Sequence, residues 1–268
     1  MPKVRANGIT LHYVEAGSGD PLLLIMGFGG DHLAWAFQTP VFAHRYRVLA
    51  FDNRGAGQSD VPDLPYTTRM MADDAAGLLD ALGIERAHVI GVSMGGMIAQ
   101  ELTLNHPRRV RSLQLHCTMA RPDGYMHALI ANWRVVRAKV TAEEWMRIVA
   151  LWLFSPTTYA ERPEFVEAII QTGIANPYPF TLTGFLRQGE AVRSHDTFDR
   201  LGKLAAPTLV SVADDDILVP ARFARELAGV VPGARFTTIA GAGHCYFWER
   251  ADVFNAMCLE FLAQHASV

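Results

Sequence analysis

Gly91-Val92-Ser93-Met94-Gly95 is the stretch that decides the fold of this chain. An apolar, β-branched run at 87–90 precedes it and a helical pattern at 97–102 follows it, which predicts a sharp turn from a strand into a helix. Such a turn holds its serine in a strained backbone conformation with the hydroxyl clear of the sheet. Ser93 is therefore the candidate nucleophile. The alternative is a serine that only caps the helix.

Strand-like and helix-like segments alternate along the chain. Two short strand patterns, at 3–7 and 9–15, meet at the hairpin signal Asn7-Gly8, and apolar runs that predict strands follow at 22–26, 47–51, 87–92, 110–116, 207–213 and 235–239. The patterns that predict helices lie at 35–44, 67–82, 94–106, 221–230 and 251–264. Buried strands separated by helices are typical of an α/β protein with a mostly parallel sheet, here of eight strands, covered by helices on both faces.

One long interval breaks this alternation. Between 119 and 197 the sequence contains no convincing strand, only amphipathic helical stretches that several prolines interrupt. We expect a helical cap inserted at 119–197 into a core made of 1–118 and 198–268. Ligands of such sheets bind beyond the carboxyl ends of the strands, where the cap would form a roof, so Trp133, Trp145 and Trp152 are candidate pocket residues. The alternative is that these rings only pack the cap on the core.

A serine nucleophile needs a base to take its proton. His244 is the preferred candidate, because it follows the last predicted strand on the glycine-rich loop 240–243, at the sheet edge toward which Ser93 points. Position alone leaves four other histidines open, namely His32, His116, His127 and His195.

The base needs an acid that orients it. Asp214, Asp215 and Asp216 follow the predicted strand at 207–213. Three adjacent carboxylates would repel one another if all were buried, so we expect one to point inward and the others to face solvent or cap the turn. A purely polar turn is the alternative, since aspartate is a common turn residue.

Taken together, these motifs resemble the α/β-hydrolase superfamily over almost the whole chain. Two further stretches carry the resemblance, Met26-Gly27-Phe28-Gly29-Gly30 after the third predicted strand and Asp52-Asn53-Arg54-Gly55-Ala56-Gly57-Gln58-Ser59 after the fourth. The family's acid stands four residues before a proline, which implies Asp216, with Ala213 in place of the usual glycine. The order of nucleophile, acid and histidine also agrees with the family.

The same resemblance implies an oxyanion hole made of two backbone N–H groups. One is that of Met94, directly after the nucleophile, and the other is that of Phe28. Met26 stands where many relatives have histidine, so the support of this loop differs from theirs.

The implied activity is hydrolysis of carboxylic esters or lactones, through an acyl-enzyme and without a metal or organic cofactor. Ser93 excludes the dehalogenases and epoxide hydrolases of the superfamily, which have aspartate at this turn. The chain is most similar to 3-oxoadipate enol-lactonase-like enzymes and small carboxylesterases, some of whose relatives open acyl-homoserine lactones. Hydrolysis of carbon–carbon bonds in ring-fission products, cofactor-free perhydrolase activity, and a ligand receptor with the same fold are the alternatives.

Composition limits the partners of the protein. A net charge of −3 without a basic cluster argues against nucleic acid, and no apolar run is long enough to span a membrane. The first residues lack a signal core and the three cysteines lack metal-binding spacing, so we expect a cytoplasmic protein with free thiols. The cap has eight basic and eight acidic residues, which favours a neutral small-molecule ester or lactone, although one arginine could still clamp a carboxylate. A homo-oligomer remains open.

Overall fold

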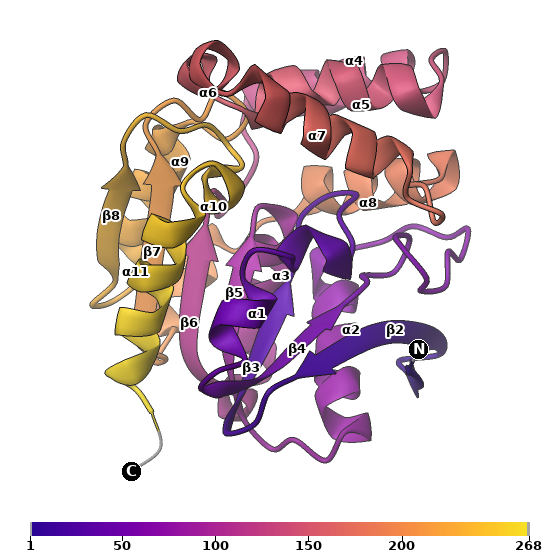
Figure 1. Cartoon of the computed structure of the whole chain (residues 1–268). Coiled ribbons are helices and arrows are strands. Elements are labelled where there is room, and N and C mark those ends of the chain that lie inside the picture. Colours follow the sequence, from indigo (N-terminus) through magenta and orange to yellow (C-terminus); the bar gives the residue numbers. More distant parts are fainter. Residues whose placement is uncertain (1, 267–268) are drawn as a thin grey trace.

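An eight-stranded sheet with the strand order β1-β2-β4-β3-β5-β6-β7-β8 forms the centre of the computed structural model, which describes residues 2–266 (Figure 1). The strands are β1 (Lys3–Ala6), β2 (Ile9–Ala16), β3 (Asp20–Ile25), β4 (Tyr46–Phe51), β5 (Ala87–Val92), β6 (Val110–His116), β7 (Thr208–Ala213) and β8 (Arg235–Ile239). Strand β2 is antiparallel to β1 and β4, and the pairs from β4 to β8 are parallel. The predicted mostly parallel sheet of eight strands is confirmed.

Helices cover both faces of the sheet and enclose a separate apolar core on each. One core contains apolar side chains of α2 (Thr68–Ala81), α3 (Met94–Asn105) and α9 (Ala221–Val230). The other contains side chains of α1 (Thr39–Phe42), α10 (Tyr246–Glu249) and α11 (Ala251–Ala263). Strands β5 and β7 are buried along their whole length, as a sheet covered on both faces requires.

The helix expected at 35–44 is wrong. Residues His32–Trp35 form a short 3-10 turn, which Asp31 caps by accepting a hydrogen bond from the Leu33 N–H, and α1 is limited to Thr39–Phe42. Pro40 explains the break, because its ring supplies no N–H and is tolerated only at the start of a helix.

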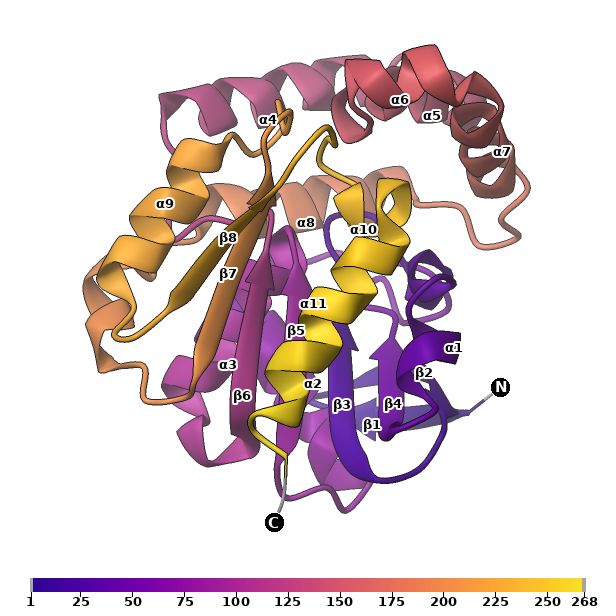
Figure 2. The same ribbon diagram turned by 60° about the vertical axis from the view of Figure 1, so that its left-hand side comes forward.

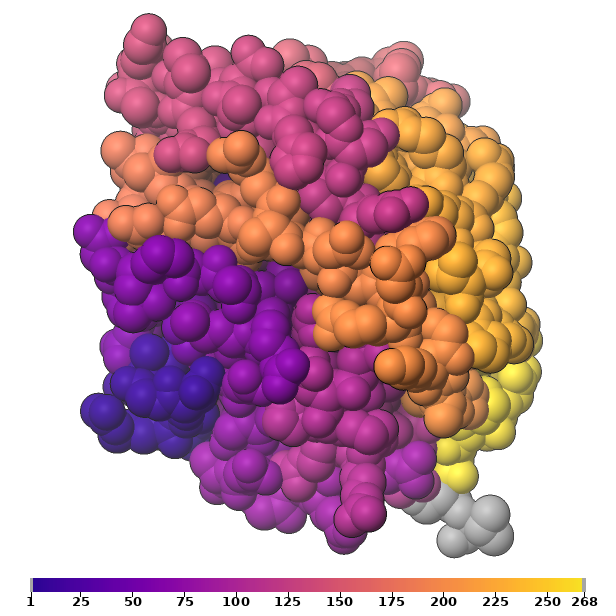
Figure 3. All heavy atoms as spheres, turned by 180° about the vertical axis from the view of Figure 1, so that it is seen from behind, coloured from indigo at the N-terminus to yellow at the C-terminus, as the bar shows by residue number. Residues whose placement is uncertain are grey.

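Five helices lie between the end of β6 and the start of β7, on the side of the carboxyl ends of the strands (Figures 1 and 2). They are α4 (Gly124–Arg137), α5 (Ala142–Leu153), α6 (Pro156–Glu161), α7 (Pro163–Ile174) and α8 (Leu182–Ser194), and we call them the cap helices. From behind, α4 runs along the top of the molecule with the band of α8 below it, next to the core (Figure 3). The extent 119–197 remains our proposed boundary of the cap.

Hydrogen-bonding side chains begin most of the cap helices. Asp123, Thr141, Ser155 and Thr181 each accept a hydrogen bond from a backbone N–H in the first turn of α4, α5, α6 and α8, respectively. Thr141 and Glu144 form a complete capping box. No helix within residues 2–266 is both long and apolar enough to cross a membrane.

Candidate active site

Ser93 lies at the turn between β5 and α3 in the strained conformation that the sequence predicts. Its φ is 56° and its ψ is −122°, in the left-handed half of φ space that side chains other than glycine rarely adopt. A Cβ atom on Gly91 would collide with the Gly95 carbonyl, and one on Gly95 would collide with the Ile25 carbonyl. The two glycines therefore let the helix start directly against the sheet, and Ser93 is held at the tip of the turn.

The main chain of Ser93 is fixed by the end of β6. Its N–H donates to the His116 carbonyl at 2.9 Å, and the Thr118 hydroxyl donates to the Ser93 carbonyl at 2.7 Å. Within residues 2–266 the Ser93 hydroxyl itself makes no hydrogen bond. The backbone is thus anchored while the hydroxyl remains available.

His244 and Asp216 form a buried hydrogen-bonded pair. The His244 Nδ1 lies 2.9 Å from the Asp216 Oδ2, and each residue is 4% exposed. The other oxygen, Oδ1, accepts the N–H groups of Leu218 at 3.0 Å and Val219 at 2.8 Å. Because Nδ1 faces the carboxylate, Nε2 is the ring nitrogen that can accept a proton from a nucleophile.

The other two aspartates of the cluster point elsewhere. Asp214 and Asp215 are exposed, and Asp214 accepts the Gly241 N–H at 2.8 Å, which ties the turn after β7 to the loop that carries His244. Of the three carboxylates, the one buried beside His244 is that of Asp216.

Cys117 connects the serine to this pair. It directly follows His116, the acceptor for the Ser93 N–H, and its sulfur lies within 4.8 Å of a ligand atom of both Asp216 and His244. The turn of Ser93 and the His244–Asp216 pair thus approach the same point at the end of β6. Burial, with the Asp216 carboxylate nearby, raises the pKa of the Cys117 thiol well above its ordinary value and keeps it protonated. No motif or spacing predicted this neighbour.

The loop after β3 lies against the serine. A Cβ atom on Gly27 would lie 3.5 Å from the Ser93 hydroxyl oxygen, and the next N–H, that of Phe28, donates to no acceptor within the described residues. The Met94 N–H is in the first turn of α3, where no carbonyl of the helix can accept it. Both expected oxyanion donors are therefore free beside Ser93, and their action on a substrate remains a prediction.

Two amide side chains support this loop in place of the family's histidine. The Asn53 side chain donates to the Met26 carbonyl at 2.8 Å. Gln188, on α8, accepts the Gly29 N–H at 2.9 Å and donates to the Arg54 carbonyl at 2.8 Å. Asn53 belongs to the motif 52–59 but has no role that its sequence position predicts, and Gln188 could not be found from the sequence because a lone glutamine in the cap forms no motif.

The three tryptophans form one cluster with Phe28. The ring centroid of Trp133 on α4 lies 5.5 Å from Trp145 and 6.1 Å from Trp152 on α5, and 6.4 Å from Phe28. Phe185 of α8 packs 5.0 Å from Phe28 on another side. The aromatic side chains of the cap thus pack against Phe28, whose backbone N–H is one of the expected oxyanion donors. Contact of these rings with a substrate remains a prediction.

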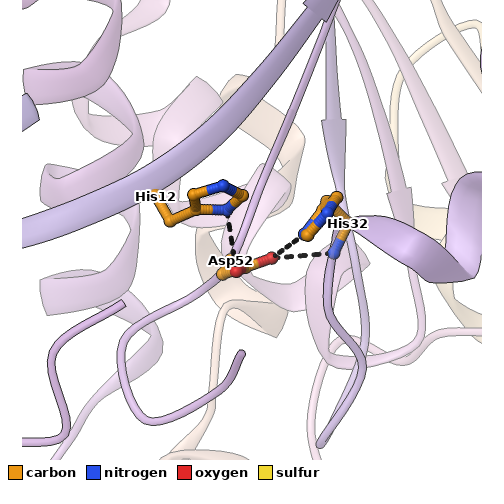
Figure 4. Close-up of side chains that lie close together, drawn as sticks. All are labelled: His12, His32 and Asp52. Carbon is orange, nitrogen blue, oxygen red and sulfur yellow. Dashed lines mark hydrogen bonds and ion pairs between the residues drawn. The ribbon is translucent and has the colours of Figure 1, made fainter. Parts of the chain in front are cut away.

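His32 belongs to a different cluster. The carboxylate of Asp52 lies between two imidazole rings, 3.0 Å from the His12 Nδ1 and 2.8 Å from the His32 Nδ1 (Figure 4). It also accepts the N–H groups of Gln58 and His32, each at 2.8 Å. Burial opposes the charge on His32, but the hydrogen bond and negative charge of Asp52 outweigh it and raise the pKa of His32. His32 is therefore ion-paired with Asp52.

The other candidate histidines also have separate surroundings. His116 pairs with the Ser211 hydroxyl at 2.6 Å, and burial lowers its pKa to about 3. His195 pairs with the Thr68 hydroxyl at 2.9 Å, and burial lowers its pKa to about 4. His127 is exposed on α4. Among the five histidines considered, His244 is the one hydrogen-bonded to a carboxylate beside the Ser93 turn.

Comparison with known proteins identifies the family of the chain. The family model of the alpha/beta hydrolase fold matches residues 20–158. A protein of Azorhizobium caulinodans named carbamate hydrolase RutD is 34% identical over 264 residues, covering 98% of this chain and 99% of its own length.

Two solved structures are also similar over nearly all of the chain. A thermophilic esterase from Thermogutta terrifontis has a TM-score of 0.89 and 28% identity, with 100% of both chains covered. The enol-lactonase from Burkholderia xenovorans LB400 has a TM-score of 0.89 and 28% identity, with 98% of this chain and 100% of that chain covered. The fold, the strained turn at Ser93 and these similarities together show that the chain belongs to the α/β-hydrolase family and is a hydrolase.

Proposed function

We propose that this protein hydrolyses carboxylic esters or lactones, with Ser93 as nucleophile, His244 as base and Asp216 as the acid that orients it. The observation that carries the proposal is the strained Ser93 turn placed at the same sheet edge as the buried His244–Asp216 hydrogen bond. A strained serine and an oriented imidazole together are the arrangement that acyl transfer requires.

The chemistry follows from these positions. His244 Nε2 takes the proton of Ser93 as the hydroxyl oxygen attacks the substrate carbonyl, and the N–H groups of Phe28 and Met94 bind the oxyanion. His244 then returns the proton to the leaving alcohol, and the C–O bond breaks to give an acyl-enzyme. In the second half, His244 takes a proton from water as the water oxygen attacks the acyl carbon. The C–O bond to Ser93 then breaks, His244 returns the proton to the Ser93 oxygen, and the carboxylic acid leaves. Each oxyanion donor contributes about 3 to 4 kcal/mol to such a reaction.

The aromatic side chains of the cap and the named relatives both support this substrate class. The aromatic cluster above Phe28 favours an apolar acyl part, and the enol-lactonase and the esterase are both close in fold. The relative named carbamate hydrolase makes carbamates the first competing class, since the same attack on a carbamoyl carbon would use the same residues.

Replacement of the nucleophile tests the proposal most directly. Ser93→Ala should lower kcat/KM on p-nitrophenyl butyrate by about 10⁴-fold or more, since nucleophile and base act as a unit, while the melting temperature stays within a few degrees. Intact-mass spectrometry of the wild type, quenched early in the reaction, should detect a butyryl group on Ser93. Retention of a few per cent of the activity by the folded variant would overturn the assignment of Ser93.

A substrate panel then separates the classes. We expect p-nitrophenyl esters of rising chain length, simple lactones and acyl-homoserine lactones to be turned over many times, and matched carbamates and carbon–carbon ring-fission products to react more slowly. A faster rate on carbamates would move the assignment to that class. A single turnover with retained ligand would instead indicate a receptor.

A further inference from the structure

Glu249, on α10, carries a buried carboxylate that the proposed reaction does not use. The residue is 3% exposed, and its Oε1 accepts the N–H of Gly243, the residue before His244, at 2.7 Å. Its Oε2 accepts three donors from the cap, namely the Ser155 N–H at 3.0 Å, the Ser155 hydroxyl at 2.9 Å and the Thr158 hydroxyl. One carboxylate thus joins the loop that carries His244 to the start of α6.

The same loop is joined to the cap directly after His244. The Cys245 N–H donates to the carbonyl of Leu153, the last residue of α5, at 2.8 Å. A Cβ atom on Gly243 would lie 2.7 Å from the Ser155 nitrogen, so the loop lies directly against the junction of α5 and α6. In Figure 1 the loop between β8 and α10 lies below α6. Both neighbours of the candidate base are therefore fixed by hydrogen bonds.

The donors to the Glu249 carboxylate are all uncharged groups. Among residues 2–266 no basic side chain forms an ion pair with it, and the Arg162 Nη1 donates to the Glu249 main-chain carbonyl instead, at 2.9 Å. Burial of a charge without a counter-ion is costly, so the four hydrogen bonds must offset that cost. Because bonds to an ionised acceptor are strong, they constrain the groups that donate them.

The bond to Asp216 alone does not place the His244 ring. That bond determines which ring nitrogen faces the carboxylate, but the position of Nε2 depends also on the backbone that carries the ring. In the proposed reaction Nε2 takes a proton from Ser93 and gives one to the leaving alcohol, so it must reach both oxygens. A misplacement of about 1 Å can cost on the order of 10²-fold in rate.

We propose that Glu249 is a positioning residue for the reaction. Through the Gly243 N–H it sets the place of the His244 ring, and through the start of α6 it makes that place depend on the cap. This inference rests on the proposed serine hydrolase mechanism and adds a residue that acts on the reaction through His244. The alternative is that Glu249 only attaches the cap to the core.

Two esters of the same acid distinguish these roles. The leaving group of p-nitrophenyl butyrate departs without a proton, whereas that of ethyl butyrate must receive one from His244. Glu249→Gln keeps the shape of the side chain but replaces one acceptor oxygen by NH2, so either Gly243 or the start of α6 loses its acceptor. We expect kcat/KM to fall by about tenfold on the p-nitrophenyl ester and by about fiftyfold on the ethyl ester. The ratio of the two values does not depend on the folded fraction, so a loss of stability alone leaves it unchanged.

Two further variants serve as a milder test and a control. Thr158→Val removes one donor of the cap at nearly constant volume, and should change the ratio in the same direction by about two- to threefold, even if Glu249→Gln does not fold. Glu101→Gln replaces another buried glutamate, 5% exposed, which pairs with Arg200 and lies in the second half of α3. It should lower the melting temperature and leave the ratio unchanged.

The NMR signal of the His244 Nδ1 proton provides a measurement that needs no substrate. In the wild type the hydrogen bond to Asp216 should place this signal at unusually low field, and its absence in His244→Gln assigns it. Glu249→Gln should shift or broaden the signal, because the ring moves relative to Asp216. Glu101→Gln should leave it in place.

An unchanged ratio in folded Glu249→Gln, or an equal change in Glu101→Gln, would overturn the positioning role and leave the esterase proposal standing. If the wild type hydrolyses neither ester, the proposed function fails instead. In that case, or if only the p-nitrophenyl ester reacts, the NMR signal decides the role of Glu249 by itself. A change in Glu249→Gln or Thr158→Val that Glu101→Gln does not share supports it, and an unchanged signal rejects it.

Discussion

Two buried aspartates near the carboxyl ends of the strands hold histidines in different ways. Asp216 holds one imidazole, that of His244, and fills its other oxygen with two backbone N–H groups. Asp52 receives four donors, from the side chains of His12 and His32 and from two backbone N–H groups. The chemical groups are the same, but the carboxylate of Asp52 is shared by two rings, and that of Asp216 orients one.

The difference shows what a catalytic pair requires beyond its residue types. The Nδ1 of His244 is fixed, and the ring lies beside the Ser93 turn, so its second nitrogen can exchange protons with a nucleophile. His12 and His32 lie beside the motif 52–59, where Ser59 also bonds to the Asp52 carbonyl. We infer that Asp52 holds the loops after β3 and β4 in place.

Replacement of the two carboxylates should have the largest effects, on activity at Asp216 and on stability at Asp52. Asp216→Asn should lower kcat by about 10⁴-fold at nearly unchanged stability, because the amide favours the wrong tautomer of His244. Asp52→Asn should lower the free energy of unfolding by about 3 kcal/mol, because the amide NH2 cannot accept the donors that one buried carboxylate oxygen now accepts, while the folded fraction keeps most of its kcat. Ester hydrolysis and urea unfolding of both variants measure the two effects.

An equal loss of activity in Asp52→Asn and Asp216→Asn, with the stability of Asp52→Asn unchanged, would contradict these separate roles. The cluster of Asp52 would then act on the reaction itself.

A smaller effect, measured at different pH values, separates the role of His32 from that of His244. His32→Gln should leave the dependence of ester hydrolysis on pH unchanged, because the proposed acceptor of the Ser93 proton is His244 and not His32. The raised pKa of His32 means that its charged form stabilises the fold fully below the unfolded-state pKa of about 6.5, and that this contribution is lost as the pH rises through the folded-state pKa. The loss of stability in His32→Gln should therefore be larger at pH 5.5 than at pH 9.

Urea unfolding at the two pH values measures this difference, and the exposed His127→Gln serves as the control. A changed dependence of the rate on pH in His32→Gln would place His32 in the proton transfer.

Neighbours of Asp216 should matter less still. Asp214→Asn and Asp215→Asn should change kcat by less than about threefold, because both side chains are exposed and only Asp216 contacts His244. Steady-state kinetics on p-nitrophenyl butyrate provides the ranking. A loss at Asp215 greater than at Asp216 would reassign the acid.

The smallest expected effect concerns metal ions. The atoms of the His12–His32–Asp52 cluster and of the Cys117–Asp216–His244 cluster are each close enough to hold a metal. Both carboxylates are already filled by N–H donors, so dialysis against EDTA should leave activity and melting temperature unchanged. Loss of activity that Zn²⁺ restores would contradict this expectation.

Much of the fold was predictable because its signals are local. The eight segments predicted as strands coincide with the eight strands to within a few residues. Because β5 is buried along its whole length, residues 87–92 are restricted to side chains that fit a buried strand. The expected helix at 35–44 failed because Pro40 starts a new helix inside the pattern. Within the candidate site, Ser93, Asp216 and His244 each follow a predicted strand, and parallel strands bring their carboxyl ends to one edge.

Contacts between distant segments were not predictable in this way. Gln188 supports Gly29 from 159 positions away, and Cys117 meets Asp216 and His244 only because β6 and β7 are neighbours. A single side chain of this kind leaves no periodicity or motif in the sequence.

Local sequence was sufficient to predict the order of strands and helices, the strained serine and the short set of candidate acids and bases, because backbone propensity and apolar periodicity act over a few residues. Which carboxylate holds which histidine followed from the packing of distant segments. Those outcomes depend on how the cap and the loops pack, and burial sets the strength of every charge and hydrogen bond within them.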